Sequence, residues 1–120
     1  MTRKVVVPTG IKPSANPLSA GVISGNLVFV AGQTAAAVDG IDGQTRAVLD
    51  RVGAVLAAAG TDFAHVLRCG VYLKDIATFA QMNAIYREYF PTEPPARTTI
   101  SCTLADPRIL IEIDCVAEIP

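Results

Sequence analysis

The sequence predicts an α+β fold, in which a mixed six-stranded sheet carries two helices on one face. Two stretches with helical periodicity, residues 42–59 and 75–90, are separated by short β-branched or apolar runs. The predicted order is strand, hairpin, helix, strand, helix and two strands, which favours one mixed sheet covered on a single side. The 120 residues contain no repeat and no linker, so we expect one domain spanning residues 1–120.

The first half of the chain supplies three strands and the longer helix. Residues 4–7 form a β-branched run, residues 10–18 contain two prolines and predict an ordered loop, and residues 21–31 predict a hairpin. Residues 42–59 predict a helix, with Gly60 as its C-terminal cap. One face of that helix collects the apolar side chains of Val48, Val52, Val55, Leu56 and Ala59.

The second half supplies a central strand, the second helix and two final strands. Residues 66–73 predict the strand, and Asp75 is a good N-cap for a helix that runs to about residue 90. The apolar stripe of this helix is Phe79, Met82, Tyr86 and Phe90. Two strands follow at 98–102 and 109–117, and the turn at 105–107 predicts that they pair as a hairpin.

Composition excludes several classes of protein. The net charge of -1 lacks the basic footprint of a nucleic-acid binder, and no apolar run approaches the ~18 residues of a membrane span. The apolar run near the N-terminus is too short for the apolar core of a signal peptide. The three cysteines form no paired framework, so we expect a cytoplasmic protein with reduced thiols. Charged residues make up 18%, below the usual level of about 25%, which favours some surface hidden in an oligomer.

Arg97 and the acids of the last strand are the main candidates for chemistry. In the predicted hairpin, Arg97 lies opposite Glu112 or Asp114, on the face that the isoleucines of this strand avoid. The pair is either an edge salt bridge on a solvated face or part of a site. Burial would raise the pKa of Glu112 and Arg97 would lower it, and the sequence does not decide between them.

Two further polar or glycine positions interrupt apolar segments. Asn83 lies on the apolar stripe of the second helix, where it is either a core amide bonded to nearby backbone or a polar wall of a pocket. Gly32 either ends its strand or lets backbone approach a ligand. His65 is the only histidine, so an all-histidine metal site is excluded, and no phosphate-binding glycine motif is present.

Taken together, these residues resemble the RidA/YjgF family of reactive-intermediate deaminases, also labelled L-PSP endoribonucleases. The resemblance covers nearly the whole chain. It is carried by the proline loop at 13–19, the apolar strand and glycine at 28–33, the helix motif at 72–83, Pro-Ala-Arg at 95–97 and Ile-Glu-Ile at 111–113. Family members often have serine where this chain has Ala31.

The resemblance implies a chorismate-mutase-like fold and a homotrimer with a pocket at each subunit interface. It also implies hydrolysis of small imine or enamine acids, such as 2-aminoacrylate and its imine, to 2-ketoacids and ammonia, without a cofactor or metal. Arg97 would clamp the substrate carboxylate, and Glu112 would hold or activate water. Gly32, with Ala31 beside it, would offer backbone to the substrate, and Asn83 would border the pocket.

Two positions depart from the family pattern. Leu18 stands where members often have an aromatic residue, and Thr99 stands where many have cysteine. Both would line the pocket, so the chain is either a deaminase of a specialised branch with another substrate or a trimer that binds small carboxylates, or acts like a chaperone, without turnover. RNA cleavage is a third hypothesis, suggested only by the family's alternative label; the missing basic stripe argues against it.

Overall fold

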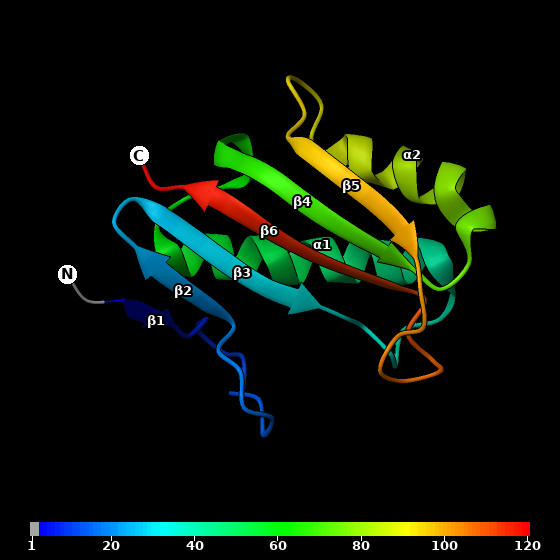
Figure 1. The fold of residues 1–120 in the computed structure, drawn as a ribbon, viewed down its shortest axis with the longest axis horizontal. Helices are drawn as coiled ribbons and strands as arrows, with labels where there is room; N and C mark the ends of the chain where they lie inside the picture. Colours follow the sequence, from blue (N-terminus) through cyan, green and yellow to red (C-terminus); the bar gives the residue numbers. More distant parts are fainter. Residues whose placement is uncertain (1–2) are drawn as a thin grey trace.

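The computed structural model describes residues 3–120, which form one mixed sheet with two α-helices behind it (Figure 1). The sheet faces the viewer in Figure 1 and the helices lie on its far side. In chain order the elements are β1 (Lys4–Val6), β2 (Gly21–Ser24), β3 (Leu27–Gln33), α1 (Gly40–Ala59), η1 (Phe63–His65), β4 (Val66–Leu73), η2 (Ile76–Thr78), α2 (Phe79–Tyr89), β5 (Ala96–Ser101) and β6 (Ile111–Glu118). The predicted six-stranded α+β fold is therefore confirmed.

The strand order is β1-β2-β3-β6-β4-β5, which corrects the predicted final hairpin. β6 does not pair with β5; it lies between β3 and β4, antiparallel to both. β5 is the edge strand and runs parallel to β4. Only Ile100 is a large apolar residue in β5, whereas β6 alternates buried and half-buried residues from Ile111 to Ala117 and ends at the exposed Glu118, and such an alternation suits a central position.

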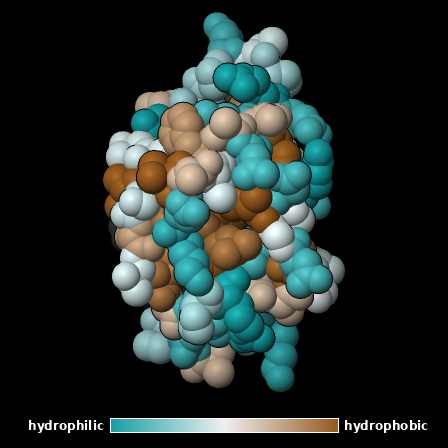
Figure 2. Space-filling model, turned by 90° about the vertical axis from the view of Figure 1, so that its right-hand side faces the viewer, coloured by the Kyte–Doolittle hydropathy of each residue, from teal (hydrophilic) through white to brown (hydrophobic). Residues whose placement is uncertain are grey.

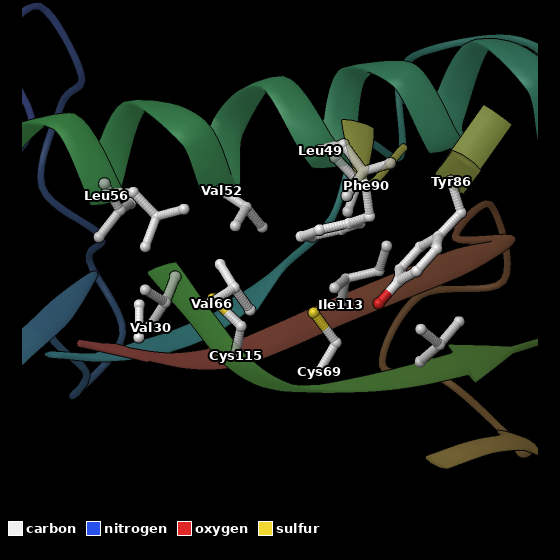
Figure 3. Close-up of a cluster of buried hydrophobic side chains, with 14 of the residues drawn as sticks. Val30, Leu49, Val52, Leu56, Val66, Cys69, Tyr86, Phe90, Ile113 and Cys115 are labelled. Carbon is white, nitrogen blue, oxygen red and sulfur yellow. The ribbon is translucent and has the colours of Figure 1, made fainter. Parts of the chain in front are cut away.

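α1 forms the main support of the sheet. Its predicted stripe is buried, and Gly60 ends the helix in the left-handed conformation with φ 88°, as predicted. Figure 3 shows Leu49, Val52 and Leu56 of α1 pointing onto Val30, Ile113 and Cys115 of the sheet. These apolar contacts fix the sheet against the helix, so the strand ends that carry the candidate site rest on a packed layer.

The second helical segment is divided in two. Asp75 caps the short η2 turn, where its Oδ1 accepts a hydrogen bond of 2.9 Å from the amide of Ala77, and α2 begins only at Phe79. Met82, Tyr86 and Phe90 of the predicted stripe are buried, but Phe79 is 39% exposed. No helix within residues 3–120 is long and apolar enough to cross a bilayer.

No other element within residues 3–120 covers the sheet face away from the helices. One row of paired residues crosses it from β1 to β6 as Val5, Val22, Phe29 and Val116, and Phe29 is 48% exposed. Beyond β6 the same face becomes polar, with Asp114, Tyr72 and Arg68. Figure 2, which views the right-hand end of Figure 1, shows hydrophobic side chains between hydrophilic ones at the surface there.

Candidate active site

Arg97 lies at the edge of the sheet, on the face that the helices cover. In the parallel ladder it stands beside Cys69 of β4, which in turn pairs with Cys115 of β6. Cys69 and Cys115 are buried under the helices (Figure 3), and neighbours in a row share one face of a sheet. The side chain of Arg97 therefore extends under α2 rather than onto the uncovered face.

One face of α2 holds the guanidinium of Arg97. Nη1 donates a hydrogen bond of 2.8 Å to Oδ1 of Asn83 and lies 3.9 Å from the sulfur of Met82. Cζ lies 5.5 Å from the ring centroid of Phe79 and 4.8 Å from that of Tyr86, at cation–π distance. The two rings stand two helical turns apart, so the guanidinium lies between them, and Nε and Nη2 have no protein partner among residues 3–120.

Arg97 and Asn83 also line a cavity of about 260 Å³ between the second half of α2 and the turn that leads into β5. The polar-wall interpretation of Asn83 thus agrees with the geometry, and its amide bonds a side chain rather than backbone.

Phe79 and Tyr86 were predicted only as apolar stripe residues. Their i, i+7 spacing around Asn83 was the available signal that this helix face could grip a cation.

Glu112 lies on the opposite face of the sheet, over Gly32. β3 and β6 shift register between Val30 and Gln33, and this irregularity brings Gly32 beneath the carboxylate. A Cβ on Gly32 would stand 2.8 Å from Cδ of Glu112 and closer still to Oε2. Glycine is therefore required here for the close approach of a side chain from β6, and Gly32 is more than a strand end.

The surroundings of Glu112 raise the pKa of its carboxyl group. Partial burial is the larger cause, and the negative charge of Asp114, two residues along β6, is the second. No hydrogen bond to Glu112 is found within the described residues. Asp114, by contrast, accepts two hydrogen bonds of 3.0 Å, one to Oδ2 from the hydroxyl of Tyr72 and one to Oδ1 from the backbone amide of Gly70.

The predicted pairing of Arg97 with Glu112 or Asp114 is wrong. Arg97 stands in the row of Cys69 and Glu112 in the row of Tyr72, three residues along β4. They are roughly 10 Å apart along the strands, roughly as far across them, and on opposite faces. The pKa of Glu112 is accordingly not lowered by Arg97.

Leu18 and Ala31 lie near Gly32 at the end of β3. Leu18 is 56% exposed and lines a second cavity of about 510 Å³, which Gly32 also borders. The amide of Ala31 donates to Ala20 at 2.9 Å, and its carbonyl accepts from Nε2 of Gln33 at 2.9 Å. The proline loop is therefore bonded to the same strand end that carries Gly32.

Thr99 lies on the face of Arg97, one pleat further along β5. Its Oγ1 is buried without a hydrogen-bond partner in the described structure, and so is the hydroxyl of Tyr86. Burial and the neighbouring Cys69 raise the pKa of Tyr86.

Among residues 3–120 no cluster of three or more His, Cys, Asp or Glu side chains could hold a metal ion. His65 forms a 2.7 Å pair with Asp62.

The chain matches one family over nearly its whole length. A family model described as Endoribonuclease L-PSP matches residues 9–119. A RutC family protein of Pyrococcus horikoshii is 37% identical over 122 residues, which cover 96% of this chain and 97% of the relative. A protein of Arabidopsis thaliana named Reactive Intermediate Deaminase A, chloroplastic, is 36% identical over 123 residues, which cover 96% of this chain and 66% of the relative.

Solved structures give the same result for the fold. Yeast Mmf1 superposes with a TM-score of 0.92 at 25% identity, covering 99% of this chain and 100% of that one. The product of the YjgF gene from E. coli superposes with a TM-score of 0.89 at 27% identity, covering 96% and 98%. A member of the YjgF family from Mycobacterium tuberculosis has a TM-score of 0.88 at 32% identity, covering 98% and 99%.

Proposed function

This chain belongs to the RidA/YjgF family, whose model is described as Endoribonuclease L-PSP, and we propose that it hydrolyses small imine or enamine carboxylates to 2-ketoacids and ammonia. The relative named Reactive Intermediate Deaminase A supports the reaction class. The observation that carries the proposal is the set of contacts made by the Arg97 guanidinium. Its guanidinium is fixed by a neutral amide and two rings, and its Nε–Nη2 edge has no partner among residues 3–120. Such an edge suits a carboxylate, which accepts two parallel hydrogen bonds.

We also propose that the active site forms between two copies of the chain in a homotrimer. Arg97 and Asn83 lie on the helix-covered face at the sheet edge, while Glu112, Gly32 and Leu18 lie at the end of β3 and the uncovered face. One chain cannot bring these groups to one small molecule. A second copy packed on the uncovered apolar row could bring its Glu112 to the Arg97 of the first.

The reaction then needs orientation and one carboxyl group. Arg97 would hold the carboxylate so that the adjacent C=N carbon faces a water on Glu112. Water adds its oxygen to that carbon and a proton to the nitrogen. The hydroxyl group of this adduct then gives up its proton to the nitrogen, the C–N bond breaks, ammonia leaves, and the C=O of the ketoacid forms. Glu112 can accept the water proton and return it to the leaving nitrogen, and its raised pKa brings the two states closer in energy near neutrality.

Hydrolysis of 2-iminobutanoate or of the imine of 2-aminoacrylate tests the reaction directly. We expect Arg97→Ala and Glu112→Gln to lose most of the rate, and Arg3→Gln, at an exposed position just before β1, to keep it. Equal rates for wild type and Arg97→Ala above the uncatalysed background would rule out the proposed role of Arg97.

Mixing two inactive variants tests the shared site. Arg97→Ala and Glu112→Gln chains are unfolded together and refolded. If each site takes Arg97 from one chain and Glu112 from its neighbour, random assembly restores about a quarter of the sites. No recovery in verified mixed oligomers would place both groups in one chain and contradict the shared site.

The departures at Leu18 and Thr99 motivate a second candidate function, in which the protein is a trimer that binds small carboxylates without turnover. Leu18 is exposed and the Thr99 hydroxyl has no hydrogen-bond partner within residues 3–120, so these two side chains would give the pocket walls that differ from the family pattern. Binding of 2-ketoacids without acceleration of any imine in a panel would favour this candidate.

We propose the cytoplasm as the compartment, since Cys69, Cys102 and Cys115 are all free thiols.

A further inference from the structure

Arg87 is a second guanidinium on the cavity that Arg97 lines. The cavity has a volume of about 260 Å³, and the described residues that line it include two cations and no carboxylate. This is a local excess of positive charge in a chain whose net charge is -1. The lining residues are Asn83, Tyr86, Arg87, Phe90, Pro94, Pro95 and Arg97.

Arg87 has no counter-ion within residues 3–120. Two other exposed arginines are paired, since Arg46 bonds Glu88 at 2.8 Å and Arg108 bonds Asp106 at 2.9 Å. The first of these pairs removes the acid closest in sequence to Arg87, because Arg46 holds both carboxylate oxygens of Glu88. The charge of Arg87 is therefore free to act on a ligand in the cavity.

The spacing of Arg87 from the Arg97 clamp fits one small molecule. Arg87 follows Asn83 by four residues on α2, so the two side chains leave the same face of the helix with Cβ atoms roughly 5–6 Å apart. Asn83 touches the Arg97 guanidinium. A ligand carboxylate seated on Arg97 thus has a second cation about one helical turn away, a span that the two ends of a four- or five-carbon diacid can bridge.

We propose that Arg87 binds a second carboxylate and that the site prefers 2-imino dicarboxylates, the imines of acidic amino acids, over monocarboxylate imines of equal length. The inference rests on the proposed deaminase function, whose clamp is Arg97. Arginine suits the role because its planar fork matches a carboxylate and stays charged. Since Arg87 is exposed, the preference weakens as salt concentration rises.

Binding of two matched 2-ketoacids tests the proposal by calorimetry. 2-Oxoglutarate and 2-oxopentanoate have the same chain length and differ in the second carboxylate. We expect wild type to bind 2-oxoglutarate about tenfold more tightly, as one charge-assisted contact would give. Arg87→Gln should lose this preference and bind 2-oxopentanoate as wild type does. Arg3→Gln removes the same charge at the N-terminus and should keep the preference.

Turnover of the two corresponding imines, made in place by an amino-acid oxidase, separates this proposal from the one on which it rests. Equal dissociation constants of the two ketoacids in wild type, or a preference that survives in Arg87→Gln, would overturn the role of Arg87. Turnover of 2-iminopentanoate in the same samples would leave the deaminase proposal intact. Absence of both binding and turnover in wild type would overturn both.

Discussion

The Nη1 atom of Arg97 donates a 2.8 Å hydrogen bond to Oδ1 of Asn83, so the guanidinium is anchored by a neutral group. An ion pair would fix the same side chain but would also neutralise it. An amide fixes it and leaves the whole charge for a ligand. Because the bond occupies Nη1, the edge formed by Nε and Nη2 is the one left for a ligand.

Asn83→Asp is therefore expected to preserve the fold and weaken substrate binding. The new carboxylate would pair with Arg97 and compete with the substrate carboxylate, raising KM by about tenfold or more. Asn83→Ala is the matched control, since it removes the anchor without adding charge and should cost about 1 kcal/mol of stability. Steady-state kinetics and urea unfolding measure the two effects. An unchanged KM in Asn83→Asp would mean that Arg97 does not hold the substrate.

Tyr86→Phe is expected to leave activity unchanged and stability equal or slightly higher. The ring that faces Arg97 remains, while a buried hydroxyl that has no hydrogen-bond partner in the described part of the chain is removed. An unsatisfied buried polar group costs about 1–3 kcal/mol, part of which the variant would recover. Tyr86→Leu removes the ring as well and should raise KM. Urea unfolding that shows Tyr86→Phe to be less stable would mean that the hydroxyl has a partner, for which the neighbouring Cys69 thiol is a candidate.

Local patterns in the sequence predicted the helices, the hairpin at 21–31 and the two faces of β6. These depend on periodicity within one segment, as in the buried row Ile111, Ile113 and Cys115. The position of β5 could not be predicted in the same way. Residues 102–110 are long enough to let β6 pair elsewhere, and the choice of partner depends on contacts distant in the sequence.

The same difference applies to the candidate site. Arg97, Glu112, Gly32 and Asn83 were each identified from their residue types in apolar surroundings and from the family motifs. Their division between two faces follows from the pairing of Arg97 with Cys69, which no local pattern reveals. A strand that is polar in most positions, as β5 is, was the available signal for an edge strand.

Gly32→Ala is expected to fold and to lose most of the activity. The backbone of Gly32 is not in the left-handed region, so alanine can adopt its conformation, but the added Cβ would displace the carboxylate of Glu112 from its close approach to this residue. A displacement of about 1 Å at a catalytic group can cost about 100-fold in rate. Gly25→Ala is a contrasting control, because it sits in an open turn with φ 60° and should cost stability rather than rate. Full kcat in Gly32→Ala would show that the position of Glu112 is not critical.

Asp114→Asn is expected to move the acidic limb of the activity profile to lower pH. The side chain of Asp114 raises the pKa of Glu112, so removing its charge lowers that pKa and keeps Glu112 ionised in more acidic solution. Tyr72→Phe is the control, because it removes one hydrogen bond to Asp114 but leaves the charge. The measurement is kcat/KM across pH. A limb that shifts equally in both variants would point to a disturbed loop or strand rather than to charge.

Glu112→Gln is expected to unfold at a higher urea concentration than wild type at neutral pH. The pKa of Glu112 is raised above its ordinary value of 4.5 on folding, so the native state binds the proton more tightly than the unfolded chain. The contribution of this group is favourable below pH 4.5 and is lost as pH rises through the raised pKa. Glutamine imitates the protonated form at every pH, so the stability difference between variant and wild type should shrink on acidification. A difference that is constant between pH 4 and pH 8 would mean that the proton has no part in it.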